Sequence, residues 1–142
     1  MEEAFWDSSA LVPICVQQQA TPSALGLGAR YEMAVWWSAP VEMRAAFARL
    51  LRTGQLTPNG HVQAQIALGT LRLTWWEVEP DEPLRQQAEH LVDRFPLKAA
   101  DAQQLAAALA WCLGKPRNRA FICGDQQLLD AARQLGFLVV PI

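Results

Sequence analysis

The stretch AFWDSSALVPI, residues 4–14, contains a change from strand to helix that decides the fold. Residues 4–6 are apolar and indicate the end of a buried strand, and the apolar residues that resume at Ala10 indicate a helix. Asp7, Ser8 and Ser9 stand between the two. An ionisable side chain at this point suits either a helix cap or a ligand for a metal cation. The stretch therefore predicts a strand–helix unit and leaves the role of Asp7 open.

The same change recurs along the rest of the chain. Apolar or alternating runs predict strands at about 4–6, 30–37, 73–79, 119–123 and 137–142. Amphipathic or alanine-rich runs predict helices at about 9–16, 41–54, 58–71, 81–95, 97–114 and 124–136, and residues 17–28 have turn composition and predict a loop. Strands that alternate with helices predict one α/β domain over residues 1–142, with a central, mainly parallel sheet flanked by helices.

The composition excludes several classes of protein. Half of the 142 residues are hydrophobic (51%) and 18% are charged, which is typical of a folded domain and not of a disordered chain. No apolar run approaches the roughly 18 residues of a membrane span, and the acidic start MEEAFW lacks the basic residues of a secretory signal. The scattered Cys15, Cys112 and Cys123 predict reduced thiols and a cytoplasmic protein, with no zinc site.

The charge balance gives no overall sign of nucleic-acid binding, because the formal net charge is −2. Any RNA contact would need a local basic patch. The tight loop with Lys115, Arg117 and Arg119 is one candidate, and the helical segment with Arg44, Arg49 and Arg52 is another. Solvated surface is the alternative reading of both.

Three carboxylates are expected at the carboxyl edge of the sheet. Asp7 follows the first predicted strand, and Glu42 lies in the first turn of the helix that follows the second strand. Asp125 comes two residues after Cys123, the last residue of the fourth predicted strand. Ligands bind at this edge of a parallel sheet. Asp101 is not placed by this argument, but it is the one charge in an alanine-rich segment. Each could be a helix cap on its own, whereas a cluster of carboxylates repels itself without a cation such as Mg²⁺ or Mn²⁺.

Four segments carry a resemblance to a known family: FWDSSALV, APVEMRAAF, LKAADAQQLAAAL and FICGDQQLLDAARQLGF. Together they resemble a PIN domain, and most of all the small prokaryotic ribonucleases typified by VapC toxins. The resemblance implies an endoribonuclease that cleaves single-stranded RNA with Mg²⁺ or Mn²⁺. It implies these residues: the acidic quartet Asp7, Glu42, Asp101 and Asp125, the supporting hydroxyl of Ser8, and Arg44 as a basic residue near the RNA.

The resemblance also implies partners. A toxin of this type would pair with an antitoxin protein that covers the acidic site, and it would form a homodimer, for which tryptophan-rich and alanine-rich surfaces are available. The sequence departs from the family at Gln103 and Gln104, where members often read DALH, and at Cys123, which replaces a Ser or Thr. Residues 17–29 have little in common with members of the family.

Two other functions remain open at this point. One is a PIN fold that binds RNA or protein without cleavage. The other is phosphoryl transfer by a dehalogenase-like or receiver-like domain, although the first expects Asp-x-Asp where this chain has residues 7–9, and the second expects a late lysine that is absent. The strand tryptophans Trp36, Trp37, Trp75 and Trp76 are expected in the core or a dimer interface, and Asp130 on the surface.

Overall fold

Five parallel strands form one sheet in the order β3-β2-β1-β4-β5. The computed structural model describes all of residues 1–142. The strands are β1 (Glu2–Trp6), β2 (Tyr31–Trp36), β3 (Trp76–Val78), β4 (Ala120–Cys123) and β5 (Leu138–Pro141). Every neighbouring pair is parallel. The prediction of an α/β domain with a central, mainly parallel sheet is therefore confirmed.

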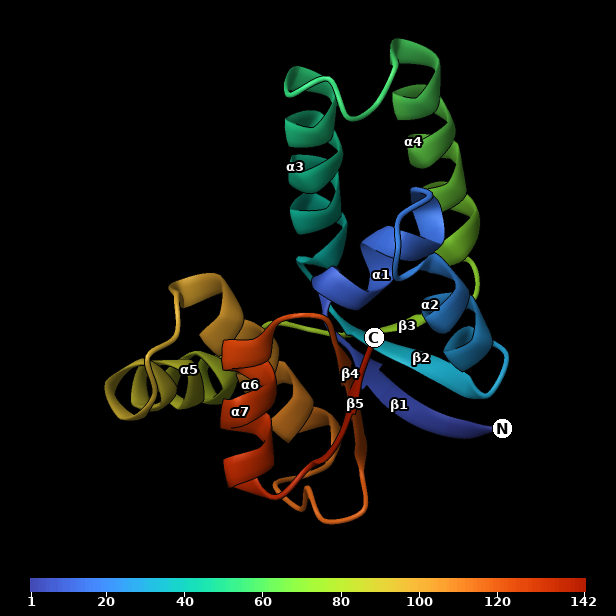
Figure 1. The fold of residues 1–142 in the computed structure, drawn as a ribbon. Coiled ribbons are helices and arrows are strands. Elements are labelled where there is room, and N and C mark those ends of the chain that lie inside the picture. The colour runs from blue at the N-terminus through green and yellow to red at the C-terminus, as the bar shows by residue number, and fades with distance from the viewer.

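Seven helices cover the two faces of this sheet (Figure 1). They are α1 (Ser8–Cys15), α2 (Thr21–Gly28), α3 (Ala39–Arg52), α4 (Pro58–Arg72), α5 (Glu82–Arg94), α6 (Ala99–Trp111) and α7 (Gln126–Leu135). Helices α1 to α4 lie on one side and α5 to α7 on the other. None of them has the length and apolar character needed to cross a bilayer.

Alternation along the strands divides the core into two. In β1, Phe5 packs with α5, α6 and α7, whereas Ala4 and Trp6 pack with α1, α3 and α4. In β4, Phe121 and Cys123 belong to the first core and Ala120 and Ile122 to the second. Residues 4–6 of β1 and all of β4 are buried on both faces, which is why these residues are apolar instead of alternating with polar ones.

The loop expected at residues 17–28 is wrong, because this segment contains α2. Thr21 organises its start: the Thr21 hydroxyl donates to the carbonyl oxygen of Pro13 at 2.6 Å and accepts from the backbone N–H of Gln18 at 2.8 Å. Ala24 is buried in the protein interior. Contacts with the rest of the fold thus override the Gly and Pro content that predicted a loop.

The strand tryptophans divide between core and surface. Trp36 and Trp75 are buried, in different cores, as expected. Trp37 and Trp76 are 51% and 43% exposed. The third strand is shorter than predicted, since β3 begins only at Trp76.

The strand order places a binding edge between β1 and β4. The chain runs outward through β1, β2 and β3, then returns to β4 on the other side of β1. In an open parallel sheet, ligands bind at the carboxyl ends of the strands where the order reverses in this way. Helices α3 and α4 project beyond that edge as a pair (Figure 1). The residues that follow β1 and β4 therefore lie where a ligand is expected to bind.

Candidate active site

An acidic cleft of about 520 Å³ opens at this edge of the sheet. Its walls come from the ends of β1 and β4 and from α1, α3 and α6. The structure brings all four predicted carboxylates to it: Asp7, Glu42, Asp101 and Asp125. Ser8 and Ser9 line it as well. Four acids from four separate segments thus face one space.

Asp7 occupies the N-cap position of α1 but does not act as a cap. No backbone N–H of the helix donates to its side chain. The Ser9 hydroxyl donates to Asp7 Oδ1 at 2.7 Å, and Ser9 Oγ also accepts from the backbone N–H of Gly124 at 2.8 Å. Ser9 therefore ties the end of β1 to the end of β4. Asp7 itself is only 3% exposed, so this carboxylate is held at the floor of the cleft.

Asp125 is a true helix cap. Its Oδ1 accepts from the backbone N–H of Leu128 at 3.1 Å. Cys123, two residues earlier, accepts from the backbone N–H of Asp125 through Sγ at 3.2 Å. Burial raises the pKa of the Cys123 thiol far above its usual range, so this side chain is neutral and structural. Asp125 thus caps α7 and also lines the cleft.

Glu42 lies in the first turn of α3 and contacts a residue that the resemblance does not assign. The side-chain amide of Gln104, in α6, donates to Glu42 Oε2 at 2.8 Å and to Ser8 Oγ at 2.9 Å. The hydroxyl of Ser8 makes no hydrogen bond with Asp7, a role that belongs to Ser9. Ser8 supports the cleft through Gln104 instead.

No ion pair neutralises the carboxylates of the cleft, and the pKa values of three of them are raised. Burial raises the pKa of Asp7 to about 6, partly offset by the hydrogen bond from Ser9. Burial also raises the pKa of Glu42 to about 7, and the charge of Asp7 adds to the rise while Gln104 opposes it. The pKa of Asp101 is raised by burial and by repulsion from Asp125, with Lys98 opposing. None of the four forms an ion pair, since both ion pairs of the protein lie on α5 and α7.

The donor chemistry of the cleft suits a hard cation bound with water. Carboxylate and hydroxyl oxygens are the ligands that Mg²⁺ and Mn²⁺ prefer. No group of three or more His, Cys, Asp or Glu side chains is placed so that it could hold a metal ion. Mg²⁺ keeps several waters and needs only one or two carboxylates. The four carboxylates therefore do not form a closed metal-binding cage, and a cation at the cleft stays a prediction.

The basic residues at the cleft are Arg49 and Lys98. Arg49 follows Glu42 by seven residues, two helical turns, so both lie on the same face of α3. Arg44 is exposed and does not line the cleft. Of the three arginines in the predicted basic segment, only Arg49 lines the cleft.

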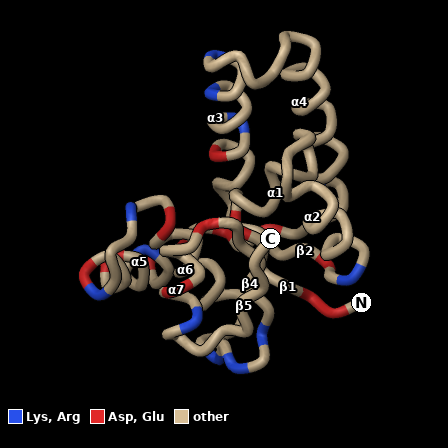
Figure 2. Tube along the Cα trace, in the orientation of Figure 1, with Lys and Arg blue, Asp and Glu red and all other residues tan.

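The predicted basic loop lies elsewhere. Lys115, Arg117 and Arg119 connect α6 to the amino end of β4, whereas the cleft is at its carboxyl end. Figure 2 shows the loop between α6 and β4 at the foot of the view, with several basic positions in blue. The guanidinium of Arg119 stacks over the Trp111 ring at 4.1 Å. The structure does not bring this loop to the acidic cleft, and RNA binding by it stays a prediction.

Two solved structures have the same fold as this chain at low sequence identity. No model of a known protein family and no curated protein matches the sequence. The crystal structure of PAE2754 from Pyrobaculum aerophilum superposes with a TM-score of 0.69 at 19% identity, over 98% of this chain and 90% of that one. FitAcB from Neisseria gonorrhoeae superposes with a TM-score of 0.61 at 14% identity, over 96% of this chain and 95% of that one. The chain has a PIN-like fold.

Proposed function

We propose that this protein is a Mg²⁺- or Mn²⁺-dependent endoribonuclease that cleaves single-stranded RNA in the cytoplasm, as a VapC-type toxin would. One observation carries the proposal: four carboxylates from four segments line one cleft at the switch point of the sheet, and no ion pair neutralises them. Like charges gathered in this way favour a bound cation.

Asp7, Glu42, Asp101 and Asp125 would hold the cation, directly or through water. When bound, such a metal makes a water more acidic and neutralises charge that develops on the phosphate. Asp7 is fixed for this role by Ser9. By the family's pattern, the water attacks phosphorus in line as the bond to the 3′-oxygen breaks, which leaves a 5′-phosphate and a 3′-hydroxyl.

Arg49 and Lys98 would attract the RNA backbone to the cleft. Both line it beside the carboxylates, and their positive charge complements the negative charge of RNA phosphates. Contacts of this kind position a nucleic acid without reading its bases. The proposal therefore includes RNA as the substrate and assigns no sequence preference.

The proposed partners are an antitoxin and a second copy of the chain. An arginine of the antitoxin would reach the carboxylates, since charge-assisted hydrogen bonds are strong. Exposed apolar side chains, among them Trp37, Val41 and Ile66, offer a surface for a two-fold pair. Light scattering at high concentration tests the homodimer, and a monomer there would count against it. Co-purification with the product of a neighbouring gene tests the antitoxin.

The decisive experiment is a cleavage assay on a labelled single-stranded RNA with Mg²⁺ or Mn²⁺. Wild type should cleave, excess chelator should stop cleavage, and Asp7→Asn should lose it while remaining folded. Asp93→Asn is the matched control, because Asp93 is exposed on α5 and outside the cleft. Cleavage that persists in chelator, or in folded Asp7→Asn, would overturn the site. A folded wild type that binds RNA without cleaving it would support the non-catalytic PIN alternative instead.

A further inference from the structure

Gln104 connects three segments that carry carboxylates of the cleft. It lies three residues after Asp101 on α6 and is fully buried. Its side-chain nitrogen donates to Ser8 Oγ, next to Asp7, and to Glu42 Oε2 on α3. The Gln104 amide thus connects α6 to two other segments. At the β1–α1 junction it contacts Ser8, the residue after Asp7, and on α3 it contacts Glu42 itself.

The amide makes these bonds while its own carbonyl oxygen remains unpaired. Gln104 Oε1 is buried and has no hydrogen-bond partner. Rotating the amide by half a turn would place this oxygen against the Glu42 carboxylate, acceptor against acceptor, so the observed orientation favours Glu42. A buried unpaired acceptor is unfavourable and calls for a reason other than packing. A leucine of similar size would fill the same space without that cost.

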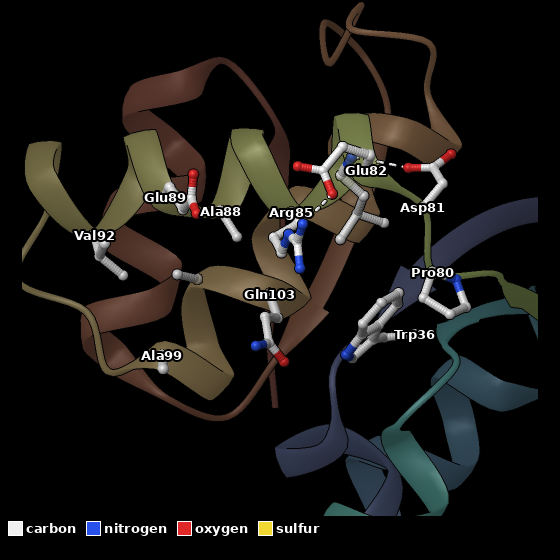
Figure 3. A pocket seen from close by; sticks show the side chains of 12 residues that line it. Trp36, Pro80, Asp81, Glu82, Arg85, Ala88, Glu89, Val92, Ala99 and Gln103 are labelled. Atoms are coloured by element: carbon white, nitrogen blue, oxygen red, sulfur yellow. Dashed lines mark hydrogen bonds and ion pairs between the residues drawn. The ribbon is translucent and has the colours of Figure 1, made fainter.

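The neighbouring glutamine, Gln103, makes no such contacts with the acidic cleft. Gln103 is exposed and lines a second cleft of about 480 Å³ between α5 and α6, together with Trp36 and Arg85. Figure 3 shows Gln103 among the residues that line that cleft. It contacts none of the four carboxylates by hydrogen bonds. One residue along the helix therefore separates a buried side chain that is bonded to residues of the acidic cleft from an exposed one that is not.

We propose that Gln104 is a positioning residue of the acidic cleft, whose amide holds the Glu42 carboxylate and the Ser8 hydroxyl in the arrangement that binds the cation. This inference rests on the proposed nuclease function. Gln104 acts through Glu42 and Ser8 and does not touch the substrate. Groups that orient metal ligands in this way commonly affect metal affinity or activity by about 10-fold to 100-fold.

The test compares Gln104→Leu with Gln103→Leu. Mn²⁺ binding is measured by calorimetry, and kcat and KM for RNA cleavage are measured at saturating Mn²⁺. We expect Gln104→Leu to weaken Mn²⁺ binding about 10-fold to 100-fold and to lower kcat, with KM for RNA unchanged. Gln103→Leu should match wild type. Gln104→His, which keeps an N–H donor, should recover part of the loss. A folded Gln104→Leu that equals wild type, or an equal loss in Gln103→Leu, would overturn the inference.

A second measurement separates this inference from the proposed function and does not need a folded Gln104→Leu. In metal-free, ¹⁵N-labelled wild type, the side-chain amide protons of Gln104 should exchange slowly with solvent, and Glu42→Ala should shift their resonances. Those of Gln103 should exchange fast and stay unchanged. If wild type neither binds Mn²⁺ nor cleaves RNA, the nuclease proposal fails, whereas fast exchange at Gln104 or insensitivity to Glu42→Ala overturns the positioning role.

Discussion

Asp7→Asn should stabilise the metal-free protein at neutral and alkaline pH. Asp7 is nearly fully buried, and burial raises its pKa from 3.8 to about 6. Between these two pH values the native state holds a proton that the unfolded chain has released. Stability from this group is therefore present below about pH 4 and is lost as the pH rises through about 6. An asparagine carries no charge at any pH, and its Oδ1 can still accept the hydrogen bond from Ser9.

The size of the effect follows from the pKa of Asp7. Each pKa unit corresponds to about 1.4 kcal/mol, so the rise from 3.8 to about 6 is worth about 3 kcal/mol. We expect Asp7→Asn to increase the free energy of unfolding by about 3 kcal/mol at pH 8 and by almost nothing at pH 4. For a chain of this length, that difference corresponds to a rise in Tm of about 10 °C.

Urea and thermal denaturation in excess chelator, at pH 4 and pH 8, measure both values. Asp93→Asn is the control, since Asp93 is exposed on α5 and forms no ion pair. Its stability difference from wild type should not depend on pH in this way. The reasoning is refuted if Asp7→Asn is no more stable than wild type at pH 8, or if its advantage is equally large at pH 4.

Three further predictions concern the surroundings of the cleft. Ser9→Ala should lower the free energy of unfolding by about 1–3 kcal/mol, measured by urea denaturation, because the buried Asp7 loses its hydrogen-bond donor. Arg49→Ala should weaken RNA binding and reduce the slope of log K against log salt by about 0.7, whereas Arg94→Ala, at an exposed position of α5 outside the cleft, should change neither quantity. Mn²⁺ at about 100 times its Kd should stabilise wild type by about 2.7 kcal/mol in a thermal-shift assay, and chelator should reverse the gain.

The order of strands and helices could be predicted because the apolar pattern sets it locally. Phe5 and Trp6 pack on opposite faces of the sheet, so the end of β1 is an apolar run in the sequence. Helix starts can be predicted from N-cap residues such as Thr57, whose side chain accepts a hydrogen bond from the backbone N–H of Gly60. The exception is α2. Its stability depends on Thr21 bonding back to Pro13 and on burial of Ala24, which no local pattern reveals.

The cleft could be predicted in outline for a topological reason. Parallel strands end at one edge, so Asp7, Glu42 and Asp125 were expected there without any coordinates. The packing of α6 then decided that Asp101 joins them. The bond from Gln104 to Glu42 depends on how α6 lies against α3, and its sequence signal is only the three-residue spacing from Asp101. Side-chain contacts between distant segments were therefore the part that the sequence left open.

Asp7 and Asp125 hold corresponding positions in the fold but make different contacts. Both stand at the N-cap position of a helix after a buried strand, but only Asp125 accepts a backbone N–H from its helix. Asp7 has a serine hydroxyl as its donor, and the pKa of about 6 means that its charge destabilises the metal-free fold at neutral pH. A buried carboxylate that neither caps a helix nor forms an ion pair does not serve stability, and residues that break local rules in this way mark functional sites. Of the two roles that the opening stretch allowed, the structure shows no N-cap hydrogen bond for Asp7, and metal ligation is the role that we propose for it.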